Sequence, residues 1–180
     1  SAATGRVNGL TMTDTIIRDS GGHGLLTEVT GGGQIANLTY SGLTVEDNDE
    51  YGIYHYSSGA GSLIGTSNIS DSVISNSANS SFYAYGTGGG DFTTINLSDM
   101  ESHNAGASGF IVYVDNAGSL ITTVSITDTL IDESANDGIN INATNGQFTT
   151  VWLSNITSNN NRDNGLSLRT SGATGLIGTA

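Results

Sequence analysis

The chain has 180 residues, the length of one domain, and 17 acidic residues against four arginines and no lysine give a formal net charge of −13. So acidic a surface excludes a role in neutralising the phosphates of nucleic acids or anionic membranes. The chain lacks cysteine, which excludes disulfides and thiolate metal sites, and it lacks a run of about 18 apolar residues, so no membrane-spanning helix is predicted.

A glycine recurs along the whole chain at spacings of 28 or 29 residues. This first glycine column consists of Gly5, Gly33, Gly61, Gly90, Gly118, Gly146 and Gly175. A second column runs in phase with it and consists of Gly24, Gly52, Ser81, Gly109, Gly138 and Gly165. Two sets of landmarks in phase indicate a repeat protein, and about six repeats fit the chain.

The first stretch of each repeat follows the first glycine column. Apolar residues lead it at Val7, Ile35, Leu63, Phe92, Leu120 and Phe148. Further apolar residues follow at Leu10, Leu38, Ile95, Val124 and Val151 and, two positions on, at Met12, Tyr40, Ile69, Leu97, Ile126 and Leu153. The period of two between these later positions predicts a strand that points them inward.

The second stretch of each repeat is less regular. It contains Ile16, Ile17, Leu43, Val45, Val73, Ile74, Leu130, Ile131 and Ile156. Its pattern predicts a strand but leaves open which of its side chains point inward.

The third stretch follows the second glycine column. An apolar residue stands directly after each member of that column, at Leu25, Ile53, Phe82, Phe110, Ile139 and Leu166. Two positions on come Thr27, His55, Ala84, Val112, Ile141 and Leu168. Because alternate residues of a strand face opposite sides, both sets are predicted to point inward.

Three short strands per repeat and no helix predict an all-β fold. The 26 glycines and abundant Ser, Thr and Asn disfavour helix throughout. A coil of 28–29 residues buries its apolar side chains only by stacking on its neighbours, about 4.8 Å apart. We therefore predict a single domain over residues 1–180, a parallel β-helix solenoid of about six coils, wound right-handed as parallel crossovers favour. The leucine-rich repeat is excluded because its signature does not recur at the glycine columns.

The chain resembles right-handed parallel β-helix proteins over its whole length. That fold hosts lyases, hydrolases, adhesins and phage spikes, so the resemblance does not select a function. Gly22-His23-Gly24 is similar to a catalytic motif of polygalacturonases, which share this fold class. However, Gly24 belongs to the second glycine column, the residue before that column varies, and the Arg-x-Lys element that accompanies the motif is missing. The residues therefore predict a protein that is not an enzyme.

Large side chains gather on the outward side of the third stretch. Alternation places one set together there: Tyr54, Tyr56, Tyr83, Tyr85, Ile111 and Tyr113. Such pairs stabilise a sheet by about 0.2–1 kcal/mol each. A patch of this size also marks a contact surface, and a glycan, a partner protein or another copy are its candidate ligands. Both interpretations stay open.

An acidic column lies between the first and second stretches. It consists of Asp14, Gly42, Asp71, Asp99, Asp128 and Asn155. Stacked about 4.8 Å apart, Asp71, Asp99 and Asp128 would repel by about 1 kcal/mol per pair in water, and Ca²⁺ would relieve this repulsion. The alternative is a solvated turn whose side chains bond backbone amides. A second column, Asp19, Asp47, Asn76, Asn104, Glu133 and Asn160, indicates another corner. No cofactor other than Ca²⁺ is indicated.

The two ends of the chain share one phase of the repeat, because SAATG at residues 1–5 matches SGATG at 171–175. Neither end resembles a cap, which predicts a segment of a longer array or a subunit that associates end to end or laterally. The uniform coils resemble the passenger stalks of bacterial adhesins and autotransporters. That resemblance implies a structural or adhesive, non-catalytic segment at the cell surface or outside the cell. The alternatives are a polysaccharide lyase or hydrolase and a carbohydrate- or ice-binding module.

Overall fold

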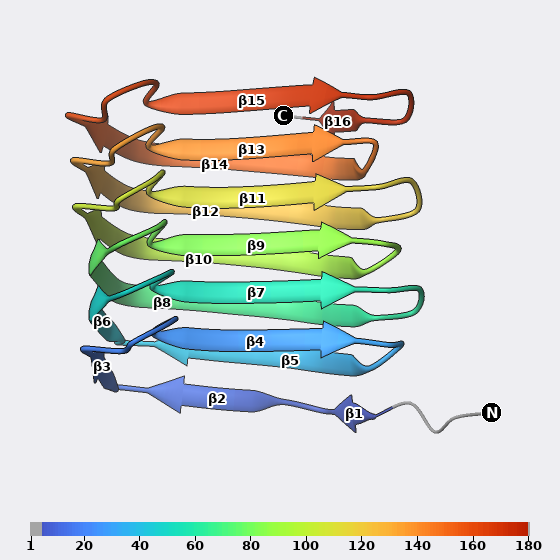
Figure 1. Ribbon diagram of the computed structural model, residues 1–180, viewed down its shortest axis with the longest axis horizontal. Coiled ribbons are helices and arrows are strands. Elements are labelled where there is room, and N and C mark those ends of the chain that lie inside the picture. The colour runs from blue at the N-terminus through green and yellow to red at the C-terminus, as the bar shows by residue number, and fades with distance from the viewer. Residues whose placement is uncertain (1–4, 180) are drawn as a thin grey trace.

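The computed structural model describes residues 5–179 as a stack of parallel coils whose regular elements are all β-strands (Figure 1). Residues 1–4, part of the predicted matching ends, lie outside this range. One six-stranded sheet contains β4 (Leu25–Thr30), β7 (Ile53–Ser58), β9 (Phe82–Thr87), β11 (Phe110–Asp115), β13 (Ile139–Thr144) and β15 (Leu166–Ser171). The prediction of an all-β parallel solenoid of about six coils is confirmed.

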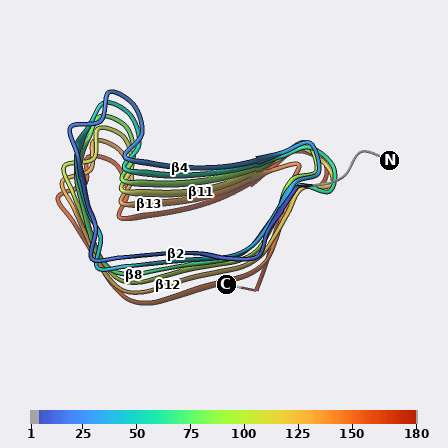
Figure 2. The same cartoon turned by 90° about the horizontal axis from the view of Figure 1, so that it is seen from below.

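A ten-stranded sheet forms the rest of each coil. Its strands are β1 (Arg6–Val7), β2 (Leu10–Thr13), β3 (Ile16–Arg18), β5 (Gln34–Ser41), β6 (Thr44–Asn48), β8 (Leu63–Ser77), β10 (Asp91–His103), β12 (Leu120–Asp132), β14 (Gln147–Asn159) and β16 (Leu176–Thr179). The first and second predicted stretches are separate strands in the first two coils. From β8 to β14 they fuse into one long strand that bends at a corner, so each coil still has three faces (Figure 2).

The winding of the coil follows from the two views. In Figure 1 the six-stranded sheet lies in front and runs left to right, the other sheet returns behind it, and the chain rises from coil to coil. Figure 2, seen from below, shows the same course as a clockwise path that recedes from the viewer. The solenoid is therefore right-handed. Within the described residues no helix is long and apolar enough to cross a membrane.

The core fills the space between the two sheets. In the central coils the predicted inward positions of the third stretch, such as Ile53, Phe110 and Val112, are fully buried. Where the stack ends, these third-stretch columns are open to solvent, with exposed fractions of 47% at Leu166 and 42% at Leu168, and the first stretch is open at Leu10 with 44%. Each coil thus completes the core of its neighbours.

The predicted first stretch is wrong by one residue in two coils. Ile64 and Ile121, and not Leu63 and Leu120, pair with Phe92 and are buried. The preceding turns explain the shift, because residues 59–62 and 116–119 make four-residue turns whereas residues 31–33 and 88–90 make three-residue turns. The extra residue moves the glycine back relative to the strand.

The structure shows which side chains of the second stretch point into the core. Val45, Ile74 and Ile131 are fully buried, and register places Ser102 and Ser158 in the same column. We name these five residues the second-stretch core column. Its two serines replace large apolar residues in their coils.

Candidate functional site

The most prominent surface feature is aromatic and lies on the outer side of the six-stranded sheet. Strands β7, β9 and β11 are neighbours there, and their register places Tyr54 beside Tyr83 and Tyr56 beside Tyr85. The next strand continues both rows with Ile111 and Tyr113. All six side chains are half-buried, whereas the residues between them are fully buried in the core. The structure therefore brings together all six residues predicted to share this face.

The rings stack along the solenoid axis. Centroids lie 5.2 Å apart for Tyr54 and Tyr83 and 5.1 Å apart for Tyr85 and Tyr113, with interplanar angles of 11° and 4°. Since atoms in contact are about 3.5–4.0 Å apart, parallel rings at these separations must be offset. In these two pairs each ring therefore covers only part of the face of its neighbour, whereas Tyr56 and Tyr85 are tilted by 36°.

Two aromatic residues extend the face beyond the predicted set. Tyr51 lies 5.0 Å from both Tyr54 and Tyr83, centroid to centroid. His23 lies 5.4 Å from Tyr51 and 5.1 Å from Tyr54. Both residues occupy the position directly before the second glycine column. In the sequence this position stands out only as variable. Two aromatic residues at that position in successive coils, next to an aromatic strand, were the available signal.

These residues form one continuous tyrosine cluster. We use that name for Tyr51, Tyr54, Tyr56, Tyr83, Tyr85 and Tyr113. Together they are six of the seven tyrosines of the chain. His23, the histidine of the Gly-His-Gly sequence, packs at the edge of the cluster, with its Nδ1 atom 2.9 Å from a carboxylate oxygen of Glu50.

Burial disfavours the phenolate form of several tyrosines in the cluster. It raises the pKa of the Tyr83 and Tyr54 hydroxyls, and the neighbouring tyrosines raise both further. Burial also raises the pKa of Tyr85, where a hydrogen bond with Thr87 opposes the effect and the Asp115 carboxylate adds to it. These three side chains therefore present neutral rings and hydroxyl groups at physiological pH rather than phenolate nucleophiles.

Carboxylates surround the tyrosine cluster. Glu28 pairs in register with Tyr56 and raises the pKa of Tyr54 through its charge. Glu50 acts in the same way on Tyr51, second to burial. Together with Asp115 they give the aromatic surface a negative rim.

The acidic column is the left-handed corner between the first and second stretches. Its non-glycine members adopt φ of 47° to 52°, and Gly42 has φ 65°. Asp and Asn tolerate this conformation better than other side chains. At this corner Asp71 accepts a hydrogen bond from Ser41 at 3.4 Å, and Asp128 accepts one from Asn155 at 2.6 Å. The positive φ fits a turn, but these two contacts join side chains of neighbouring coils and not the backbone amides expected for a solvated turn.

The second corner column has the same conformation, with φ of 50° to 58°. Its side chains form a partial ladder, in which Asn76 donates to Asp47 at 3.0 Å and Asn104 donates to Asn76 at 3.2 Å. Across residues 5–179, no three His, Asp or Glu side chains gather closely enough to hold a metal ion. Calcium binding at Asp71, Asp99 and Asp128 stays a prediction.

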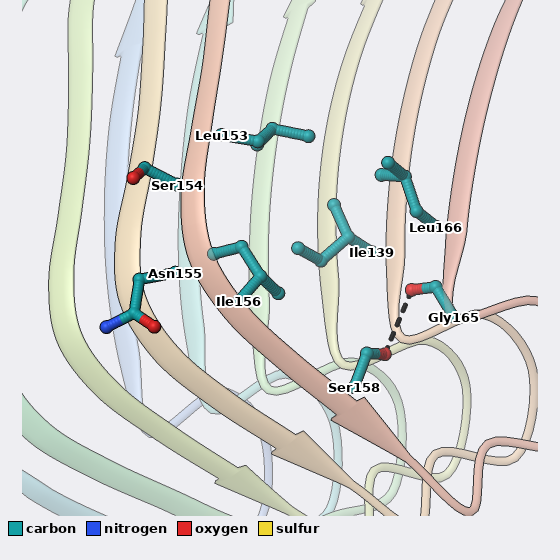
Figure 3. Close-up of a pocket in the computed structure, with 8 residues that line it drawn as sticks. All are labelled: Ile139, Leu153, Ser154, Asn155, Ile156, Ser158, Gly165 and Leu166. Carbon is teal, nitrogen blue, oxygen red and sulfur yellow. Dashed lines mark hydrogen bonds between the residues drawn. The ribbon is translucent and has the colours of Figure 1, made fainter.

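The C-terminal end of the stack leaves the core open. A hollow of about 430 Å³ lies between β13, β14 and β15 (Figure 3). Leu153 and Ile156 line it from one sheet and Ile139 and Leu166 from the other, and at its edge Ser158 donates a hydrogen bond to the carbonyl of Gly165 at 3.0 Å. The apolar part of the lining belongs to columns that form the core in the interior coils.

In comparisons with known proteins, no protein-family model, curated protein or solved structure matches the chain. The resemblance to adhesin and autotransporter stalks therefore rests on the repeat alone. The tyrosine cluster and the open ends of the stack are the features from which a function can be argued.

Proposed function

We propose that the chain is a non-catalytic structural segment of an extracellular or cell-surface solenoid, in which further coils of a longer chain or of another copy cover the open ends. The observation that carries this proposal is the unbroken register of coil on coil between Arg6 and Thr179. A stack of this kind is extended by adding coils, because every coil presents the same strands and apolar columns to the next.

The ends support the proposal because they retain the features of an interior coil. Val7 and Leu10 at one end and Leu166 and Leu168 at the other are exposed although their columns are core elsewhere. The outermost strands also present unpaired backbone groups, which form a template for another strand. A further coil would bury the exposed apolar side chains and would pair with the free backbone groups.

The short connections support a non-catalytic role. The turns that leave the six-stranded sheet, at residues 31–33, 59–62, 88–90, 116–119 and 145–146, contain two to four residues each, and the connections that lead back to it, at 19–24, 49–52, 78–81, 104–109, 133–138 and 160–165, contain four to six. Enzymes usually carry catalytic and binding residues on loops placed by a rigid scaffold. Turns this short build no wall for a substrate cleft.

A tandem chain tests the proposal. Residue 179 is joined to residue 10 of a second copy, which preserves the phase of the repeat because Gly175 corresponds to Gly5. We expect electron microscopy to show one rod of about twice the length, and calorimetry to show one unfolding transition at a higher temperature than for the single chain. Two separate particles joined by a linker would contradict the proposal.

The matched control joins residue 178 to residue 10. This deletion shifts the joint by one position, which turns inward side chains outward and prevents the second copy from pairing in register.

Incubation with acidic polysaccharides, with and without Ca²⁺, tests the enzyme alternative. We expect no product, and robust product formation would overturn the non-catalytic assignment.

A further inference from the structure

We propose that the tyrosine cluster and its rim of carboxylates bind an arginine-rich segment of a partner protein. This inference concerns the side of the solenoid and does not depend on what covers its ends. It follows from three features of the surface: aromatic side chains that are partly exposed, carboxylates beside them, and the absence of arginine and lysine from the strands that carry the cluster.

The aromatic faces are the first feature. Offset stacking in the Tyr54–Tyr83 and Tyr85–Tyr113 pairs leaves part of each ring face uncovered by its column neighbour, and Tyr113 has an aromatic neighbour on only one side of its column. A guanidinium group placed over a tyrosine face is attracted by the negative face of the ring. The planar guanidinium also stacks on such faces, which an ammonium group does less well.

The negative rim is the second feature. Glu28 precedes Tyr56 in its row, Glu50 directly precedes Tyr51 in the chain, and Asp115 is the last residue of β11, two residues after Tyr113. One carboxylate therefore stands at the N-terminal end of an aromatic row, and two stand beside the cluster. A neutral glycan would gain nothing from these charges, and both an acidic polysaccharide and a second copy of net charge −13 would be repelled.

The missing cation is the third feature. The chain has no lysine, and its arginines are confined to the first and last coils, at Arg6, Arg18, Arg162 and Arg169. Arg18 pairs with Glu46 at 2.9 Å, and Arg169, in the same outward row two strands beyond Tyr113, approaches Asp137 to 3.8 Å. The strands that carry the tyrosine cluster therefore contain no guanidinium of their own, and in this proposal the partner segment supplies it.

Titration with a hexaarginine peptide tests the proposal. We expect saturable binding that weakens by about tenfold when Tyr83→Leu and Tyr85→Leu are combined, because leucine keeps apolar bulk and removes the aromatic face. The variant Tyr83→Phe/Tyr85→Phe keeps the rings and should retain affinity within about threefold. Circular dichroism and thermal unfolding establish that each variant is folded.

A second double variant changes two carboxylates of the rim and leaves the rings intact. Glu28→Gln combined with Asp115→Asn should weaken hexaarginine binding by about threefold to tenfold at low salt, and the affinity should then depend less on ionic strength. The matched control changes Trp152 to Leu and Glu101 to Gln, an exposed aromatic and an exposed carboxylate on the other sheet. It should bind like the wild type.

Two further ligands identify the chemistry. Hexalysine should bind more weakly than hexaarginine, and a neutral glucan hexasaccharide should not bind. The proposal is overturned if hexaarginine does not bind, if it binds the Tyr83→Leu/Tyr85→Leu variant as tightly as the wild type, or if the glucan binds and the leucine variant loses that binding. The last outcome would assign the surface to a glycan instead.

Discussion

The second glycine column is explained residue by residue by what lies opposite it. A Cβ atom on Gly24 would come within 2.6 Å of Val45, and one on Gly109 would come within 2.5 Å of Ile131. The column admits a serine only at Ser81, where the second-stretch core column has Ser102 in place of a large apolar residue. Ser102 donates a hydrogen bond to the Ser81 hydroxyl at 2.8 Å. Side-chain size is therefore matched at Ser81 and Ser102, whereas in a later coil Gly138 faces the smaller Ser158.

This matching predicts a compensating pair. Ser102→Ile alone should destabilise the fold by about 2 kcal/mol, because the added atoms overpack against Ser81 and leave its hydroxyl without its partner. Adding Ser81→Gly should recover at least about 1 kcal/mol, since it recreates the Gly and Ile pairing of neighbouring coils. Urea unfolding of both single variants and the double variant measures the coupling, and strictly additive effects would refute the explanation.

His55 is a polar residue in the hydrophobic core. It is fully buried between Tyr40 and Phe82, with ring centroids 5.9 and 5.6 Å away, and neither of its ring nitrogens has a hydrogen-bond partner. Burial lowers its pKa to about 3. The imidazole is therefore neutral in the folded protein at pH 7, and protonating it requires opening the core.

The lowered pKa of His55 predicts acid sensitivity. The unfolded chain takes up this proton near pH 6.5 and the folded chain only near pH 3, so stability is lost as the pH falls between these values. Between pH 7 and pH 5 the loss from this group is about 2 kcal/mol. His55→Leu and His55→Phe should both remove that part of the pH dependence in urea unfolding. If both variants keep the pH dependence of the wild type, the proposed contribution of His55 to acid sensitivity is wrong.

At the scale of the element, the corners decide where each long strand turns. β10 and β12 keep their pairing on both sides of Asp99 and Asp128, and these two residues alone take the left-handed conformation within their strands. Repeating the bend at the same place in each coil keeps the parallel register on both faces. The carboxyl groups of the column are thus a consequence of backbone geometry.

Substitution of Asp99 separates the corner role from a charge role. Asp99→Val should cost about 1–2 kcal/mol, because a β-branched residue is strained at positive φ, whereas Asp99→Gly should stay within about 0.5 kcal/mol of the wild type. Glu101→Val removes a carboxylate in the same strand without that strain and should be nearly neutral. Thermal unfolding with Ca²⁺ and with a chelator tests the calcium prediction, which is wrong if the midpoint does not change.

At the scale of the whole molecule, stability should vary along the stack. Interior coils have neighbours on both sides, whereas the coils at either end have one, and in a linear array stability is a sum of such neighbour terms. We expect backbone amides of β9 and β11 to exchange with deuterium most slowly and those of β3 and β15 most rapidly. Uniform protection along the stack would contradict this.

The candidate site was predictable where it depends on alternation within one strand. The six residues from Tyr54 to Tyr113 follow from period two and a shared phase. The positions of Tyr51 and His23 could not be predicted in this way, because these residues lie outside the strands and join the face only through the packing of adjacent coils. The one-residue error at Leu63 has a similar origin, since turn length sets the register between coils and leaves the repeat spacing almost unchanged.

The sequence by itself determined the repeat, the parallel stack and most of the inward columns, because glycine spacing and alternation are local properties that recur in every coil. Only the tertiary structure decided which side chains meet between coils: the match of Ser81 with Ser102, the isolation of His55, the left-handed corners and the full extent of the tyrosine cluster. Those contacts depend on register and backbone conformation at the turns, and a residue pattern constrains these only loosely.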